Sequence, residues 1–111
     1  MAFAKVCLLD DLWQGEIMAA VAGDRHVLLI HTDDGTIVAT QAVCPHQEAE
    51  LSEGELCGRI LTCRMHLWQF DVVTGKGVNP THAELAQYPV KIHDGTVYVE
   101  TDGIEPKFAH S

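Results

Sequence analysis

The feature that most constrains this chain is a pair of short motifs, C-P-H and C-R-M-H, with sixteen residues between them. Each motif supplies one thiol and one imidazole, Cys44 and His46 in the first and Cys63 and His66 in the second. Thiolates and imidazoles are common protein ligands of zinc and of iron–sulfur centres. Two of each complete the ligand set of one metal centre, so the fold has to bring two separate loops together.

The distribution of the ligands between the motifs favours an iron–sulfur cluster. A zinc finger of the helical kind uses one pair of cysteines and then one pair of histidines. Here each motif mixes sulfur with nitrogen. The mixture suits a two-iron cluster in which one iron takes both thiolates and the other takes both imidazoles. A single zinc ion remains the alternative, because Cys and His spacing alone does not identify a metal.

The pattern C-x-H followed by C-x-x-H resembles that of Rieske 2Fe–2S ferredoxins, over nearly the whole chain. Finer matches are C-P-H-Q, L-S-E-G, C-x-x-H-L-W-x-F, G-x-G-x-N-P and the closing F-A-H-S. In these the chain looks like the ferredoxin component of bacterial toluene and benzene monooxygenases, which use a diiron hydroxylase. The resemblance implies that Cys44 and Cys63 bind the iron that stays ferric. It implies that His46 and His66 bind the iron that changes valence and lie near the surface.

The resemblance implies an electron carrier that transforms no substrate itself, so no catalytic residue is expected. It would take single electrons from an NADH-dependent reductase with flavin and iron–sulfur centres. It would pass them to the diiron hydroxylase of an aromatic monooxygenase in hydrocarbon catabolism. The alternatives are a ferredoxin of an aromatic-ring dioxygenase, a small Rieske subunit of nitrite reductase, or a zinc-stabilised β module that binds proteins. The chain is too short for an oxygenase with a second, mononuclear iron site.

Several residues near the motifs are expected to support the site, and for the glycine and proline residues of the third loop the resemblance favours that role. Pro45 fixes the backbone between two ligands. Gly75, Gly77 and Pro80 are expected to form a tight loop that covers a third side of the cluster, with an ordinary surface turn as the alternative. Trp68 either caps the cluster against water, contacts a partner or packs in the core.

Two departures from high-potential Rieske proteins predict a low reduction potential. Those proteins carry an extra, disulfide-bonded cysteine in each loop, where this chain has Ala49 and Met65. They also place Ser and Tyr hydroxyls beside the cluster, where this chain has Trp68 and Phe70. Fewer hydrogen bonds to the cluster sulfurs stabilise the reduced form less, so we expect a potential of about −150 mV.

The two remaining cysteines are not assigned as ligands. Cys7 and Cys57 are expected to be free thiols, because the N-terminus shows no secretory signal and cytoplasmic proteins rarely form disulfides. Cys57 is the one rival ligand, but its setting E-L-C-G-R-I is typical of the start of a strand.

Arg64 could pair with the reduced cluster or with a partner. Four carboxylates form either a docking face or a solvated acidic loop: Glu48, Glu50, Glu53 and Glu55.

The hydrophobic pattern predicts an all-β fold in a single domain, residues 1–111. Asp33-Asp34-Gly35 and Asp94-Gly95 are turn signals between apolar runs. Strands are expected at 5–9, 15–22, 27–31, 36–41, 60–62, 68–71, 88–93 and 96–100, with one helical turn at 81–86. With the resemblance, the expectation becomes a Rieske fold, an antiparallel β sandwich or barrel with an inserted cluster-binding subdomain. Residues 1–42 and 81–111 would form the scaffold, and residues 43–80 the subdomain.

Charge and hydropathy exclude some classes of partner. The formal net charge of −9 repels the nucleic-acid backbone and favours docking to basic patches on proteins. No run is long and apolar enough to span a bilayer. The N-terminus lacks the basic and then apolar pattern of a secretory signal. We therefore expect a cytoplasmic monomer that binds neither nucleic acid nor membrane.

Overall fold

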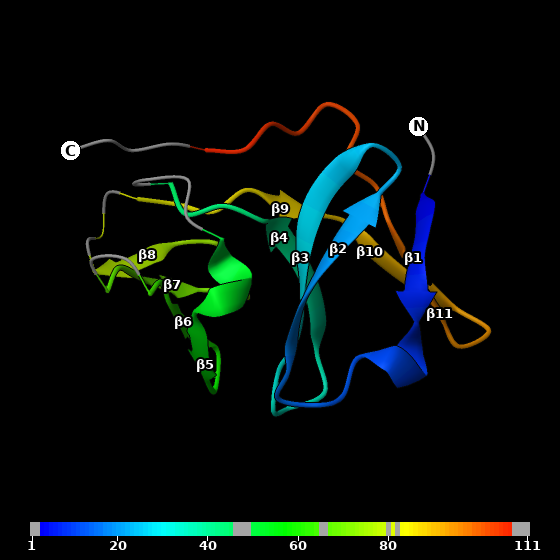
Figure 1. Ribbon diagram of the computed structural model, residues 1–111, viewed down its shortest axis with the longest axis horizontal. Coiled ribbons are helices and arrows are strands. Elements are labelled where there is room, and N and C mark those ends of the chain that lie inside the picture. The colour runs from blue at the N-terminus through cyan, green and yellow to red at the C-terminus, as the bar shows by residue number, and fades with distance from the viewer. Residues whose placement is uncertain (1–2, 46–49, 65–66, 80, 82, 108–111) are drawn as a thin grey trace.

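The structure, a computed structural model, describes residues 3–45, 50–64, 67–79, 81 and 83–107. The chain forms three small antiparallel sheets (Figure 1). Helical structure in these residues is limited to two short 3-10 turns, η1 (Leu9–Asp11) and η2 (Leu51–Glu53). The all-β expectation is therefore confirmed. No helix within the described ranges is long and apolar enough to cross a membrane.

The central sheet separates two apolar cores. Within β3 the run from Val27 to Ile30 is fully buried, as expected for a strand covered on both faces. Successive side chains of a strand point to opposite faces, so Val27 and Leu29 enter one core while Leu28 and Ile30 enter the other. The sheet has the order β2 (Ile17–Ala22), β3 (Arg25–His31), β4 (Ile37–Gln41) and β9 (Gln87–Tyr88).

A three-stranded sheet encloses the core that contains Val27 and Leu29. Its Asp94-Gly95 hairpin is confirmed, with His93 paired to Thr96. Both turn residues have positive φ, 52° and 73°, as a two-residue turn of this type requires. The sheet has the order β1 (Ala4–Leu8), β11 (Thr96–Val99) and β10 (Val90–His93).

The third sheet lies on the opposite side of the central sheet, on the left in Figure 1. It is a meander of four strands of three residues each, and the second motif lies between its second and third strands. Gly77 was expected in a loop but belongs to the last strand, paired with Phe70. The strands are β5 (Glu55–Cys57), β6 (Ile60–Thr62), β7 (Gln69–Asp71) and β8 (Gly77–Asn79). The division into a scaffold and a subdomain at residues 43 and 80 stays a prediction.

Two further expectations from the sequence were wrong. The strand predicted at 88–93 is interrupted at Pro89, which has no N–H to donate to a ladder. As a result, β9 pairs with β4 whereas β10 pairs with β11, and the chain passes from one sheet to the other at this proline. The helical turn predicted at 81–86 is contradicted at residues 83–86, which contain no helix and include an antiparallel bridge between Glu84 and Lys76.

Residues 83–86 form backbone hydrogen bonds with the start of β8 and the turn before it. Gly77 N donates to Ala83 O at 2.8 Å, and Leu85 N donates to Gly75 O at 2.7 Å. These residues therefore pair with the turn that leads into β8. The partners, Gly77 and Gly75, are separated from this segment by the rest of β8 and the residues after it, so local propensity could not indicate these bonds.

Gly75 provides a test of this close packing. It has φ of +80°, and a Cβ there would lie 2.7 Å from Leu85 O. Gly58 has a similar φ of +61°, with nothing within 4 Å of its Cβ position. We expect Gly58→Ala to cost about 1–2 kcal/mol for the left-handed backbone alone. Gly75→Ala should cost about 1–3 kcal/mol more, because the new methyl group displaces backbone.

Urea unfolding of the two alanine variants measures this difference. Equal losses at the two positions would show that the approach of Leu85 to Gly75 imposes no constraint.

Candidate metal centre

Cys44 and Cys63 enter the same apolar core from two different connections. Cys44 follows β4 and Cys63 follows β6, and both side chains are fully buried. Neither thiol forms a disulfide. The other buried members of this core are Leu28, Ile30, Leu51, Leu61, Phe70, Val72, Ala83 and Leu85. The structure thus brings together the two thiols that the sequence assigned to one metal centre.

Each thiol lies at the start of a loop whose two ends are joined by backbone pairing. Val43 and Glu50 form an antiparallel bridge across the ends of the first loop. In the second, Cys63 N donates to Trp68 O at 2.7 Å. Pro45, which is buried, restricts φ directly after Cys44. The backbone that carries each cysteine is therefore held close to one geometry.

Several of the predicted residues lie outside the described part of the chain. They include both predicted imidazole ligands, so the full ligand set stays a prediction. Among the residues that the structure does describe, no group of three or more His, Cys, Asp or Glu side chains could hold a metal ion. The residues outside are His46, Glu48, Ala49, Met65, His66 and Pro80.

The two remaining cysteines are free thiols, as expected. Cys57 is exposed on β5 and is not a member of the core that holds Cys44 and Cys63. Cys7 is half-buried on β1, in the sheet on the other side of the molecule. Its burial, and then the nearby Asp11 carboxylate, raise the pKa of the Cys7 thiol.

Trp68 contributes to the core beside the two thiols. It is partly buried and packs against the core that contains Cys44 and Cys63. Its ring lies 6.5 Å from that of Phe70, centroid to centroid, with the planes tilted by 51°. The packing role weighed for Trp68 is therefore present. Phe70 is fully buried and brings no hydroxyl group. The lack of this hydroxyl is one reason for expecting a low reduction potential, and the value of the potential stays a prediction.

The loop after Cys63 contains a residue that sequence reasoning missed. Leu67 adopts a positive φ of 57°, and its side chain is 68% exposed. Such a conformation is unfavourable for a residue other than glycine, and it tends to occur at functional sites. The C-x-x-H-L-W-x-F match includes this leucine, but nothing in the sequence indicates its backbone conformation, since leucine is not a turn former.

Arg64, in the same loop, has a defined partner. Its guanidinium donates to the Glu53 carboxylate at 2.7 Å, and both side chains are more than half exposed. An ion pair so exposed contributes little to stability. The sequence alone allowed either the reduced cluster or another protein as the partner of Arg64. In the structure Arg64 pairs with Glu53 of the same chain.

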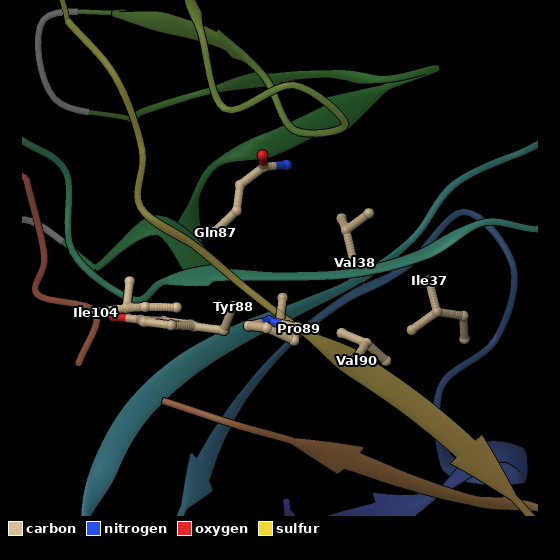
Figure 2. Close-up of a pocket in the computed structure, with 8 residues that line it drawn as sticks. Ile37, Val38, Gln87, Tyr88, Pro89, Val90 and Ile104 are labelled. Carbon is tan, nitrogen blue, oxygen red and sulfur yellow. The ribbon is translucent and has the colours of Figure 1, made fainter. Parts of the chain in front are cut away.

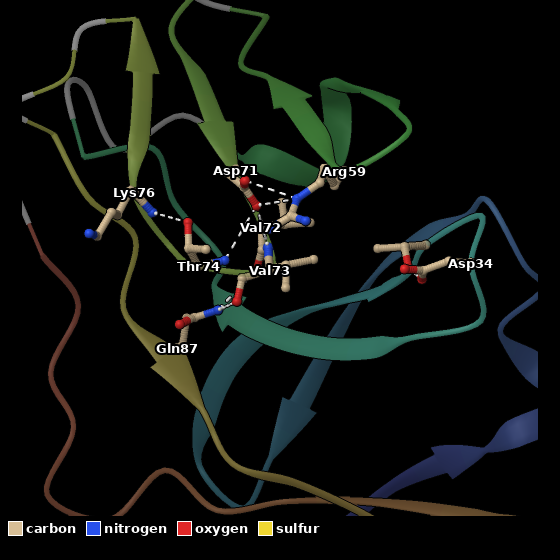
Figure 3. A network of polar contacts seen from close by, with 9 residues as sticks. Asp34, Arg59, Asp71, Val72, Val73, Thr74, Lys76 and Gln87 are labelled. Atoms are coloured by element: carbon tan, nitrogen blue, oxygen red, sulfur yellow. Dashed lines mark hydrogen bonds and ion pairs between the residues drawn. The ribbon is translucent and has the colours of Figure 1, made fainter.

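Asp71, the last residue of β7, is the centre of a polar network that fixes the turn into β8 (Figure 3). Its carboxylate accepts from Arg59 Nε at 3.0 and 2.9 Å and from the backbone N–H groups of Val73 and Thr74. Burial acts to raise the pKa of Asp71, but the Arg59 hydrogen bond and these backbone donors lower it below its ordinary value. Gln87 Nε2, from β9, donates to Val73 O at 2.7 Å and joins this turn to the central sheet.

The lowered pKa of Asp71 predicts a loss of stability in acid. The carboxylate contributes at pH values above its unfolded pKa of about 3.9. This contribution disappears as the pH falls through the lower pKa of the folded state. Asp71→Asn should lower the free energy of unfolding by about 1–2 kcal/mol at pH 7. The deficit should shrink below about pH 4.

Urea unfolding at pH 7 and in acid measures this effect, with Asp102→Asn, at an exposed turn, as the control. A deficit of Asp71→Asn that does not change with pH would assign the effect to packing instead of charge.

Comparison with known proteins identifies the class of the fold and site. Residues 2–89 match the family model of the Rieske [2Fe-2S] domain. The chain therefore belongs to the Rieske family, and the likeness inferred from the two motifs is confirmed.

Relatives and solved structures narrow the class. The ferredoxin component of the alkene monooxygenase system of Xanthobacter autotrophicus is 39% identical over 101 residues, covering 90% of this chain and 82% of that protein. The biphenyl dioxygenase ferredoxin subunit of a Pseudomonas species is 38% identical over 102 residues, covering 90% and 93%. A ferredoxin–oxygenase complex of carbazole 1,9a-dioxygenase contains a chain with a TM-score of 0.80 and 31% identity, covering 96% of this chain and 97% of that one. The chain is a Rieske ferredoxin with one Rieske-type 2Fe–2S cluster.

The described residues fit such a cluster. An iron that takes two thiolates needs two cysteines that are free of disulfide bonds and that converge from separate loops, and Cys44 and Cys63 meet this requirement. Their apolar surroundings limit the access of solvent, one of the factors that set the potential of an iron–sulfur centre. The family match therefore favours the two-iron cluster over the single zinc ion.

Proposed function

We propose that Cys44, His46, Cys63 and His66 bind the cluster, with the thiolates on one iron and the imidazoles on the other. The proposal is supported by the burial of both cysteines in one core and by the mixed Cys and His motifs. The bound cluster supplies one-electron transfer. The chain itself excludes water from the thiolates and holds the two loops closed, which limits rearrangement when the charge changes. Residues 43–80 act as the cluster-binding subdomain on the scaffold of residues 1–42 and 81–111.

We propose that the protein carries single electrons from an NADH-dependent flavin and iron–sulfur reductase to the diiron hydroxylase of a toluene- or benzene-type monooxygenase. The observation that carries this proposal is the set of finer motif matches, including H-L-W-x-F and the closing F-A-H-S. The 39% identity to the ferredoxin component of a monooxygenase system supports it. The protein is then a component of a multicomponent monooxygenase and not an enzyme by itself.

A ferredoxin of an aromatic-ring dioxygenase is the second candidate. The specific observation in its favour is the 38% identity to a biphenyl dioxygenase ferredoxin subunit, at almost complete coverage of that protein. The electron-transfer chemistry is the same in both cases. The terminal oxygenase is what differs.

The partner surface that we propose is acidic. Glu50, Glu53 and Glu55 are exposed, and the whole chain has a net charge of −9. Glu53 and Glu55 lie beside the loop that follows Cys63, since Glu53 bonds Arg64 and Glu55 pairs with Thr62. Complementary charge accelerates encounter with a basic partner, most strongly at low salt. Glu53 is paired with Arg64, so Glu55 is the clearer test of this surface.

Replacement of the proposed ligands tests the cluster assignment. Cys44→Ser and Cys63→Ser should abolish stable cluster binding, because each removes one of the two thiolates from the same iron. His66→Cys should permit some assembly but lower the reduction potential, since an added thiolate brings negative charge. Iron and acid-labile sulfide content, EPR spectra and the midpoint potential are the measurements.

Cys57→Ser is the matched control for these variants and should retain the spectrum and the potential of the parent. Full iron and sulfide in Cys44→Ser, or an unchanged potential in His66→Cys, would contradict the ligand assignment.

Reconstitution identifies the partner. The protein should support NADH-dependent product formation with a diiron aromatic hydroxylase and its reductase, and Cys44→Ser should not. Product formation only with a ring dioxygenase would replace the first candidate by the second. In the productive system, Glu55→Gln should lower kcat/KM for the ferredoxin at low salt and have little effect at high salt. An unchanged value at low salt would remove Glu55 from the docking surface.

A further inference from the structure

Gln41 is a buried amide that joins three segments of the chain. It is the last residue of β4 and lies three positions before Cys44, with no exposed surface. Its Nε2 donates to Val43 O and to Lys107 O, both at 2.9 Å. Its Oε1 accepts from Ala86 N and from Lys107 N, both at 2.8 Å. An amide has two donor hydrogens and two acceptor lone pairs, so the whole hydrogen-bonding capacity of this side chain is used.

The segment joined to β4 in this way is Thr101–Lys107, called here the C-terminal segment. It runs from β11 across the top of the molecule in Figure 1, and it lies beyond the residues matched by the family model, 2–89. Exposed ion pairs contribute little, so the buried bonds to Gln41 are its principal polar attachment among those described. The ion pairs of the segment are Arg25–Glu105 at 3.3 Å and Glu84–Lys107 at 3.4 Å.

The apolar attachment of the C-terminal segment is partial. Figure 2 shows Ile104 beside Tyr88, at the edge of a cavity of about 360 Å³ that is also lined by Pro89 and Val90. Ile104 packs against the core on this side but remains partly exposed. Because this contact is incomplete, the position of the segment depends strongly on its two hydrogen bonds to Gln41.

We propose that Gln41 is a positioning residue for Cys44. The bond from Nε2 holds the carbonyl of Val43, which belongs to the peptide unit that leads directly into Cys44. Because a peptide unit is planar, a fixed carbonyl direction also fixes the direction in which the chain enters Cys44. Val43 is, in addition, the residue whose bridge to Glu50 joins the two ends of the first loop.

The C-terminal segment takes part because it holds the amide in its orientation. Without Lys107, one donor hydrogen and one acceptor lone pair of a buried side chain would lose their partners, an arrangement that proteins avoid. The amide would then turn toward other partners and release Val43 O. The C-terminal segment thereby acts on the backbone next to a thiol far earlier in the chain, since Lys107 lies 66 positions after Gln41. The consequence for the cluster rests on the proposed ligand role of Cys44, whereas the consequence for the loop does not.

Hydrogen exchange and iron release in the holoprotein test the proposal. Gln41→Met keeps the approximate length of the side chain but removes all four hydrogen bonds. It should speed amide exchange in the peptide containing residues 42–45 about tenfold, and iron release to a chelator by a similar factor. The EPR spectrum should broaden, because the loop samples more than one geometry.

Matched variants separate positioning from general stability. Gln87→Met also removes a glutamine that donates to two backbone carbonyls, those of Val72 and Val73, but it has no bond to the C-terminal segment. It should change exchange at residues 42–45 only as far as global stability changes. Lys107→Pro removes the N–H that reaches Gln41 and should act like Gln41→Met. Lys107→Met removes the charge but keeps that N–H, and it should behave like the parent.

Each outcome decides a different point. If Gln41→Met exchanges at residues 42–45 no faster than Gln87→Met of equal stability, Gln41 has no positioning role. Faster exchange with unchanged iron release would support the positioning role but overturn Cys44 as a ligand. If Gln41→Met does not accumulate as folded protein, the comparison of Lys107→Pro with Lys107→Met decides, and equal exchange in those two variants would overturn the proposal.

Discussion

The burial of two thiols in an apolar core is the constraint on which the rest of the structure depends. A thiol that is to bind metal as a thiolate needs a site held by the fold, since the charged form is costly to bury without a partner. The fold provides this site by directing alternate residues of β3 to opposite faces. Leu28 and Ile30 belong to the core that contains both cysteines, while Val27 and Leu29 belong to the core on the other side of the sheet. One strand therefore supports both the scaffold and the site.

The two loops that carry the cysteines are each closed by backbone pairing. The bridge between Val43 and Glu50 and the hydrogen bond from Cys63 to Trp68 each join residues only a few positions apart. Polar side chains then hold neighbouring backbone. Gln41, at the end of β4, bonds Val43 O before Cys44 and also bonds Lys107. Gln87, from β9, bonds Val73 O in the turn after β7 and joins that turn to the central sheet.

The parts of the fold that were predictable from the sequence are those governed by local chemistry. The Asp94-Gly95 turn needs two residues that tolerate positive φ, and the apolar run of β3 reports burial on both faces. The two mixed motifs indicated the cofactor class. What could not be predicted depends on pairing between separate segments, such as the backbone bonds of Ala83 and Leu85 and the hydrogen bonds of Gln41 to Ala86 and Lys107. Pro89 did carry a signal, because a proline within an expected strand indicates an interruption.

The left-handed backbone conformation of Leu67 determines which substitutions this position tolerates. Glycine or asparagine would adopt this backbone at lower cost, and the leucine side chain points mostly into solvent. Exchange of this residue therefore alters the outer surface while the thiol-bearing backbone next to it keeps its shape. A single substitution at this position can therefore change the side chain presented to solvent without a compensating change in the interior.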